Sequence, residues 1–221
     1  MARAYMGGPE AALRATADAL AKVGTAAAVV LVEGISDQLA LETAAANRGR
    51  DLVAERVVIA PIGGAHAIGR FLTKLRDGVR LAGLCDVHEE EVFRRGLVAA
   101  RVGAPRNRAD MELLGFFVCV RDLEDELIRA VGLPAVEELL DAHGDLAALR
   151  SFQNQPAWRG RPPAAQMRRF LCSGSRRKLR YVRLLVEAAA HRDALPHPLA
   201  GLLAAIESGP SQRSWRTATN L

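Results

Sequence analysis

The order of apolar and polar positions along the chain alternates between two periods. Short, mostly apolar runs have the length of strands that are buried on both faces: residues 26–32, 56–62, 79–85 and 113–120. Helix-like stretches separate the first three of these runs, at residues 36–48 and 65–77. Because strands that alternate with helices build parallel sheets with right-handed crossovers, we expect an α/β fold with about four mainly parallel strands flanked by helices.

The second half of the chain has a different pattern. Beyond Arg121 the periodicity is helical and is broken only at prolines. We therefore expect three parts: an N-terminal helical segment over 1–25, an α/β domain over 26–130, and a helical, arginine-rich C-terminal extension over 131–221.

Composition restricts the class of protein. Half of the 221 residues are hydrophobic and the mean hydropathy is +0.05, so the chain has enough apolar surface for a core and is not disordered. There is no apolar run of about 20 residues and no export signal at the N-terminus, which predicts a cytoplasmic protein without a membrane anchor. The three cysteines are widely separated, which favours reduced core residues over disulfides or a zinc cluster.

The position of the charges tells more than their sum. Basic residues exceed acidic ones by only 30 to 25, but residues 151–186 contain no Asp or Glu. That stretch supplies the candidate nucleic-acid contacts, Arg168, Arg169, Arg176, Arg177 and Arg180. The segregation favours an anion-binding surface, and a solvated arginine face is the plainer alternative.

Carboxylates follow two of the predicted strands. Glu33 comes directly after the first strand and Asp86 directly after the third, while Asp37 lies one helical turn beyond Glu33. Ligands of open parallel sheets bind beyond the carboxyl ends of the strands, so these side chains should meet there. Such an oxygen cluster is typical of an Mg²⁺ or Mn²⁺ site. The alternative is that they are ordinary loop and first-turn acids, with Asp37 favoured by the helix dipole.

Three short segments together resemble a known domain. Val32-Glu-Gly-Ile-Ser-Asp37, Ile59-Ala-Pro-Ile-Gly-Gly64 and Leu81-Ala-Gly-Leu-Cys-Asp-Val-His88 look like a TOPRIM domain. Their spacing is most similar to that of the OLD-family (overcoming lysogenisation defect) nucleases. The resemblance covers residues 26–126, with a weaker echo to about 185. It implies a Rossmann-like TOPRIM fold and divalent metal ions, expected to be two, that serve phosphodiester chemistry.

The resemblance also suggests roles for individual residues. Glu33 matches the glutamate after the first strand, a metal ligand and catalytic residue, and Asp37 matches the second acid that OLD-like members add. Asp86 matches the first aspartate of Asp-x-Asp. Glu124 resembles the glutamate that completes a second metal site, and Lys178 resembles the lysine that stabilises the pentavalent phosphate. A plain helix N-terminal acid and a surface cation are the alternatives for the last two.

The sequence departs from the family pattern in two respects. His88 stands where the second aspartate is expected; it is a candidate metal ligand that would favour Mn²⁺ over Mg²⁺, or a structural residue. The ATPase module that OLD proteins carry is not expected within these residues, because they contain no Gly-Lys-Ser/Thr phosphate loop.

The resemblance thus implies a metal-dependent DNA endonuclease. Its expected partners are DNA and, as further candidates, a separately encoded ATPase and a second copy of the chain. Two alternatives stay open: nucleotidyl transfer in the manner of a primase, and a non-catalytic nucleic-acid or partner-binding module whose metal site is weakened at His88.

Overall fold

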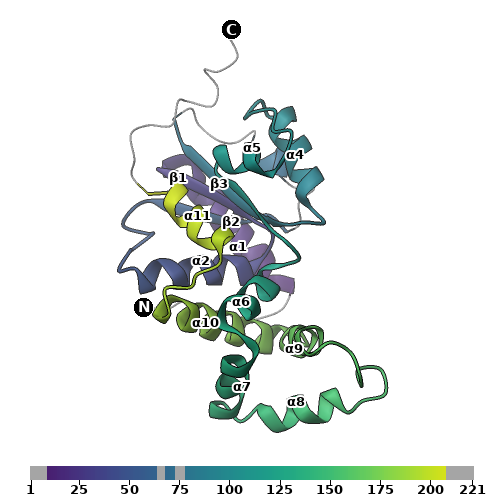
Figure 1. The fold of residues 1–221 in the computed structure, drawn as a ribbon. Helices are drawn as coiled ribbons and strands as arrows, with labels where there is room; N and C mark the ends of the chain where they lie inside the picture. The colour runs from purple at the N-terminus through teal and green to yellow at the C-terminus, as the bar shows by residue number, and fades with distance from the viewer. Residues whose placement is uncertain (1–8, 64–67, 73–77, 208–221) are drawn as a thin grey trace.

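The computed structural model describes residues 9–63, 68–72 and 78–207 (Figure 1). One parallel sheet contains the strands β1 (Ala28–Val32), β2 (Val57–Pro61), β3 (Arg80–Asp86) and β4 (Phe116–Cys119), in the order β2-β1-β3-β4. All four predicted strands are confirmed, each within a few residues of the expected position. The α/β fold class is therefore confirmed.

Helices surround the sheet and continue beyond it. The first set consists of α1 (Pro9–Lys22), the short 3₁₀ helix η1 (Val23–Thr25), α2 (Ile35–Asn47), α3 (Ile68–Leu72), α4 (Glu90–Ala99), α5 (Arg108–Leu113) and α6 (Leu123–Val131). The second set consists of α7 (Leu133–Ala142), α8 (Leu146–Gln153), α9 (Pro163–Leu171), α10 (Ser175–His191) and α11 (His197–Ala205). Residues 64–67 and 73–77 of the helical stretch expected over 65–77 lie outside the described part, as does His66.

The sheet is buried on both faces. Within β1, Val30 and Val32 belong to one apolar cluster and Val29 and Leu31 belong to another. Because successive side chains of a strand point to opposite faces, the two clusters are the two sides of the sheet. This double burial explains why β1 reads as an unbroken apolar run.

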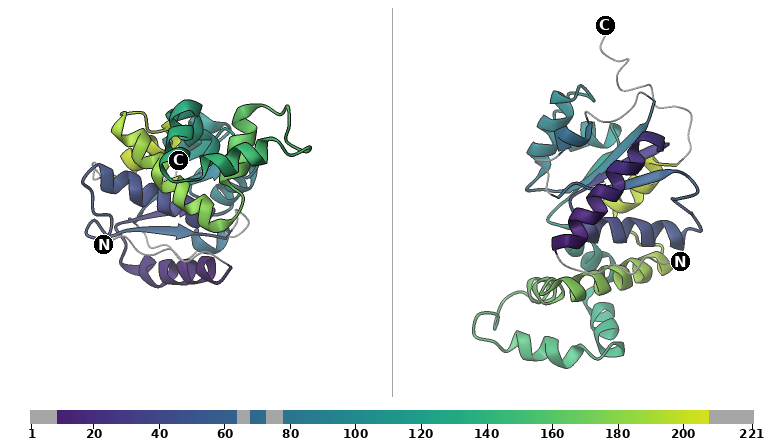
Figure 2. Two further views of the ribbon diagram at one scale, coloured as in Figure 1. Left: turned by 90° about the horizontal axis from the view of Figure 1, so that it is seen from below. Right: turned by 180° about the vertical axis from the view of Figure 1, so that it is seen from behind.

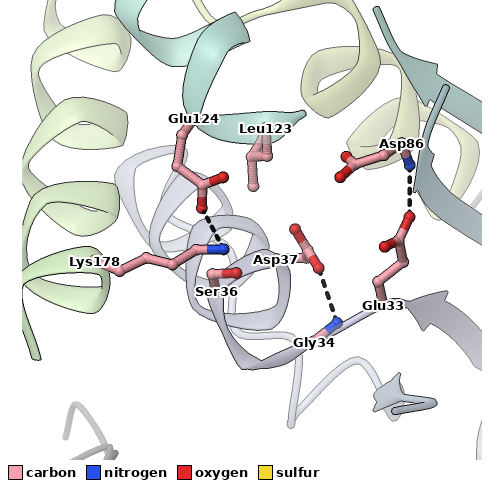
Figure 3. A pocket seen from close by; sticks show the side chains of 8 residues that line it. All are labelled: Glu33, Gly34, Ser36, Asp37, Asp86, Leu123, Glu124 and Lys178. Carbon is pink, nitrogen blue, oxygen red and sulfur yellow. Dashed lines mark hydrogen bonds and ion pairs between the residues drawn. The ribbon is translucent and has the colours of Figure 1, made fainter. Parts of the chain in front are cut away.

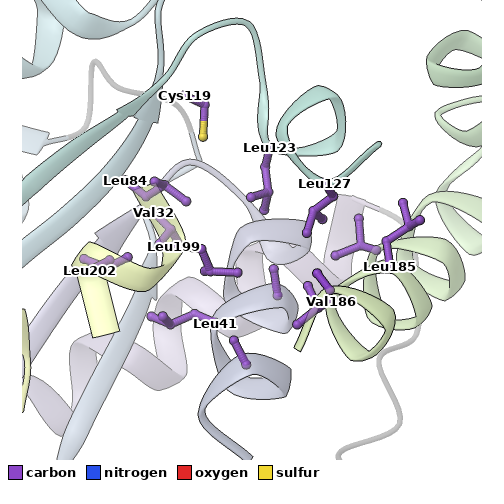
Figure 4. Packing of buried hydrophobic residues seen from close by; sticks show 14 of the residues in the cluster. Val32, Leu41, Leu84, Cys119, Leu123, Leu127, Leu185, Val186, Leu199 and Leu202 are labelled. Carbon is purple, nitrogen blue, oxygen red and sulfur yellow. The ribbon is translucent and has the colours of Figure 1, made fainter. Parts of the chain in front are cut away.

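Each face has its own helices. Residues of α2, α6, α10 and α11 cover one face, while residues of α1, α3, α4 and α5 cover the other. Figure 2 shows α1 across the sheet from α2 and α10. Figure 4 shows strand residues such as Val32 packed in one core with residues of α2, α6, α10 and α11, among them Leu41 of α2 and Val186 of α10.

The C-terminal part of the chain returns to the sheet. Helix α11 packs on β3 and β4, and α10 packs along α2 and against α6. Gly201 allows the close approach of α11, because a Cβ there would lie 2.3 Å from the Phe117 ring. Helices α7 to α9 (residues 133–171) form an arm that lies beyond α10, away from the sheet (Figure 1). No described helix has the length and apolar content needed to cross a membrane.

Candidate functional site

The strand order places a pocket at the carboxyl end of the sheet. The chain runs from β1 to β2 on one side of β1, and from β2 it crosses back to β3 on the other side. The crevice between β1 and β3 is therefore the topological switch point, where ligands bind in open α/β sheets. The pocket there is lined by Glu33, Gly34, Ser36, Asp37, Asp86, Leu123, Glu124 and Lys178 (Figure 3). Sequence-predicted residues from β1, β3, α2, α6 and α10 thus meet at one place.

Glu33 and Asp86 are joined across the two strand ends. Asp86 is the last residue of β3, and its backbone N–H donates to Oε1 of Glu33 at 2.6 Å. Burial raises the pKa of Glu33, although this hydrogen bond opposes the shift. Burial, together with the nearby Glu33 carboxylate, raises the pKa of Asp86 to about 8. The expectation that the two side chains lie at neighbouring strand ends is confirmed.

Asp37 is fixed by the start of α2. Gly34, in extended conformation, precedes the helix, and its backbone N–H donates to Oδ2 of Asp37 at 2.9 Å. Burial and repulsion from Glu124 raise the pKa of Asp37 to about 7. Asp37 lines the pocket, and its negative charge is poorly stabilised there because the side chain is desolvated and lies near another carboxylate.

Glu124 and Lys178 face each other from α6 and α10. Lys178 Nζ lies 3.0 Å from Oε1 of Glu124, which is only 5% exposed; the contact is an ion pair without good hydrogen-bond alignment. Burial alone would lower the pKa of Lys178, but the Glu124 carboxylate outweighs it and the pKa is raised. The ammonium group is thus charged and is already used in neutralising one carboxylate.

The start of α6 is held from several sides. Asp122 caps the helix by accepting from the Asp125 N–H at 2.8 Å, and it also pairs with Arg168 of α9. Glu126 accepts from the Val120 N–H at 2.8 Å and pairs with Arg129. These contacts fix the turn of α6 that presents Glu124.

Lys178 reaches the pocket because of a turn at Gly174. This residue has φ +101°, a backbone conformation that favours glycine, and it links α9 to the start of α10. The buried side chains of α10, such as Val182 and Val186, then pack into the core beside α2. The sequence pattern does not reveal this turn, which sets the position of Lys178 in the first part of α10.

The oxygen donors of the pocket suit a hard divalent cation. Four carboxylates line it, and a cation between them would relieve the repulsion and desolvation that raise the pKa of three of them. Nevertheless, in the described part of the chain no three Asp, Glu, His or Cys side chains lie close enough together to hold a metal ion as they stand. Metal binding would therefore require the carboxylates to move toward one another.

His88 has no place in the pocket wall. It lies in the turn after β3, is exposed, and is not among the lining residues. Its role as a metal ligand stays a prediction that no contact of the pocket supports.

The five candidate arginines fall into three groups. Arg168 pairs with Asp122, and Arg180 lies 3.2 Å from Oδ2 of Asp145. Arg177 donates to Ser173 Oγ at 2.7 Å and stacks on Phe170, 4.2 Å from the ring centre. Arg169 and Arg176 are exposed and form no ion pair within the described residues. Only the last two are fully available for a ligand.

Sequence reasoning missed three residues of the pocket. Gly34, Ser36 and Leu123 line it, and none was a candidate. The position of Ser36 between Glu33 and Asp37 was the only signal that could have pointed to it.

Part of the chain matches a known protein family. Residues 25–86 match the family model described as the overcoming lysogenization defect protein-like TOPRIM domain. No curated protein matches the chain.

Two solved structures show the same fold. The C-terminal region of the OLD protein of Xanthomonas campestris pv. campestris aligns with a TM-score of 0.57 at 18% identity, over 84% of this chain and 94% of that one. The corresponding region of the Burkholderia pseudomallei OLD protein gives 0.54 at 15% identity, over 82% and 97%. Residues 25–86 are therefore similar to an OLD-like TOPRIM domain, and the chain shares the fold of the C-terminal regions of these two OLD proteins.

Proposed function

We propose that the chain is a metal-dependent DNA endonuclease whose active site is the pocket between β1 and β3. The OLD-like TOPRIM match supports a module that acts on nucleic acids. The observation that carries the finer proposal is the convergence of four carboxylates and one lysine at the switch point of the sheet.

The proposed metal ligands are Glu33, Asp37, Asp86 and Glu124, with Mg²⁺ or Mn²⁺ as the ions. When bound, two such ions would supply an activated water and stabilisation of the leaving oxygen. His88 is left out of this set, because it lies outside the pocket wall.

The chain's own residues would orient and neutralise the substrate. The Asp86 N–H fixes the Glu33 carboxylate, and the raised pKa of Glu33 suits it to take up and release a proton at Oε2. Lys178, once released from Glu124, would place a positive charge beside the scissile phosphate. Leu123 would contribute an apolar wall that limits the access of water.

A non-catalytic binding module is the second candidate. It is favoured by the lack of a preassembled metal cluster among residues 9–63, 68–72 and 78–207. Nucleotidyl transfer, a separate ATPase partner and a homodimer stay predictions of the sequence.

Glu33→Gln should abolish cleavage and leave the fold intact. The amide oxygen can still accept from the Asp86 N–H, but the group can neither hold a divalent cation well nor exchange a proton, so we expect a rate loss of about 100-fold or more. The measurement is nicking and linearisation of plasmid DNA with Mg²⁺ and with Mn²⁺, alongside incorporation of labelled nucleotides.

Glu138→Gln is the matched control, because Glu138 is exposed on α7 and lies outside the pocket. Equal cleavage by the wild type and Glu33→Gln would refute the assignment. Plasmid that stays intact with a wild type that binds neither metal would favour the non-catalytic module, and incorporated nucleotides would favour nucleotidyl transfer.

The exposed and the paired arginines should behave differently. Replacing both Arg169 and Arg176 with alanine should weaken binding to duplexes of any sequence. The salt slope, which is the slope of the logarithm of the binding constant against the logarithm of the salt concentration, should become shallower by about 1.8, since each phosphate contact contributes about 0.9.

Arg168→Met should instead lower the free energy of unfolding by about 2 kcal/mol, because it leaves the buried Asp122 carboxylate without its partner. Fluorescence anisotropy over a salt series and urea denaturation measure the two effects; a double variant with an unchanged salt slope would rule out this arginine surface as the DNA contact.

A further inference from the structure

Ser36 stands out among the residues that line the pocket. It is 9% exposed, it lies in the wall of the pocket, and its hydroxyl has no hydrogen-bond partner among the residues that the structure describes. The hydroxyl oxygen is not among the buried unpaired side-chain atoms, so it is open to the pocket, where water or a ligand can bind it. Ser36 therefore has a donor available at the point where the proposed substrate would lie.

The backbone around Ser36 offers donors as well. Ser36 is the second residue of α2, a helix of 13 residues, and the N–H groups of its first turn have no acceptor within the helix. Gly34, which precedes the helix, has no side chain to cap them, and Asp37 accepts from the Gly34 N–H instead. The N–H groups of Ile35, Ser36 and Asp37 have no acceptor in the described part of the chain.

Figure 3 shows how the Ser36 side chain lies relative to the acids. Ser36 lies toward one end of the pocket with Lys178 and Glu124, which pair with each other, and Glu33 and Asp86 lie toward the other end. A group bound between the two ends would meet hydrogen-bond donors and one already paired carboxylate on one side, and two carboxylates on the other. A phosphate held to the carboxylates through divalent cations has oxygens left over that match this donor side.

We propose that Ser36 Oγ and the first-turn N–H groups of α2 bind a non-bridging oxygen of the substrate phosphate. The inference rests on the proposed function, because four carboxylates would repel a phosphate unless bound cations neutralise them. It adds a phosphate-binding residue, Ser36, that neither the sequence motif nor the comparisons assign.

The test separates metal binding from phosphate binding. Calorimetry measures first the affinity for Mn²⁺ and then, with Mn²⁺ saturating, the affinity for thymidine 5′-monophosphate. Ser36→Ala should leave the Mn²⁺ affinity within about twofold and weaken nucleotide binding about tenfold or more, as expected for the loss of a hydrogen bond to a charged group. Ser36→Thr keeps the hydroxyl and should stay within about threefold of the wild type.

Ser151→Ala is the matched control, since Ser151 is an exposed helical serine on α8 that donates to the Ala147 carbonyl. Thermal melting of each variant shows whether it is folded. Nucleotide affinity that is equal in the wild type and Ser36→Ala, or a wild type that binds Mn²⁺ but no nucleotide, overturns this inference and leaves the metal site standing. Loss of Mn²⁺ binding in Ser36→Ala overturns it too, because Ser36 would then act on the metal. A wild type that binds no divalent cation overturns the proposed function, and this inference with it.

Discussion

Lys178→Met should bind Mn²⁺ more tightly than the wild type and yet cleave DNA far more slowly. In the structure the Lys178 ammonium lies 3.0 Å from Glu124 and serves as a built-in counter-charge for a proposed metal ligand. Removing it frees Glu124 and takes one positive charge out of a half-buried pocket. A divalent cation then meets less repulsion and does not have to break the ion pair between Lys178 and Glu124. At about 5 Å and an effective dielectric constant near 20, a unit charge and a divalent cation repel each other by about 7 kcal/mol, and even after solvent screening we expect roughly tenfold tighter binding.

The same substitution removes the only positive side chain among the pocket-lining residues, so the phosphate loses its cationic partner. A rate loss of about 100-fold is the expected size for a group that stabilises developing charge. Calorimetric Mn²⁺ titration and single-turnover cleavage measure the two effects. Lys22→Met is the control, because Lys22 is exposed at the end of α1, a helix on the opposite side of the sheet. Metal affinity that falls with the rate would show that Lys178 supports the fold of the pocket instead of competing with the cation.

Much of the fold could be predicted because strands that are buried on both faces leave a recognisable apolar pattern in the sequence. A strand with helices on both faces, such as β1, must be apolar at every position, and this leaves an unbroken valine-rich run. The acids Glu33 and Asp86 could be placed for the same reason: each marks the point where a buried strand ends. Asp37 follows from Glu33 by helical spacing.

What could not be predicted depends on contacts between distant parts of the chain. The pairing of Lys178 with Glu124 needs the turn at Gly174 and the packing of α10 beside α2 and α6, and no local pattern encodes either. The acid-free stretch suggested one uniform anion-binding surface, but Arg168 and Arg180 each find an acid from a segment far away in the sequence, Asp122 and Asp145. The exposure of His88 depends on how the turn after β3 is oriented, which spacing alone does not determine.

The protein without metal should lose stability as the pH rises from about 4 to about 8. In the unfolded chain an aspartate releases its proton near its ordinary pKa of 3.8, whereas in the folded chain Asp37 holds its proton to about pH 7 and Asp86 to about pH 8. Between these values the folded state binds more protons than the unfolded state, so raising the pH favours unfolding. Each pKa unit corresponds to about 1.4 kcal/mol, and with allowance for partial solvent exposure we expect a loss on the order of 3 kcal/mol.

Other acids act in the opposite direction but at lower pH. Glu55 and Asp110 have lowered pKa values because arginine side chains or backbone N–H groups bind them, so the stability they contribute is lost only as the pH falls below the ordinary range of a carboxyl group. The change in the free energy of unfolding between pH 5.5 and pH 8 therefore reports the titration of the pocket carboxylates. Saturating Mg²⁺ at pH 8 should restore the lost stability, since an ion that binds only the folded state stabilises it by mass action.

Asp37→Asn assigns this effect to one residue. The amide can still accept from the Gly34 N–H but carries no charge, so the variant should unfold at higher urea concentration than the wild type at pH 8 without metal, and its stability should change less between pH 5.5 and pH 8. It should also gain little stability from Mg²⁺, because a ligand is missing. Asp18→Asn, on the exposed side of α1, should behave as the wild type in both respects. A variant that kept the full pH dependence and the full response to Mg²⁺ would show that the charge of Asp37 neither destabilises the pocket nor binds the cation. A variant that is more stable without metal and indifferent to Mg²⁺ would mean that the pocket gives up stability to keep its carboxylates together, as a site built for a cation must.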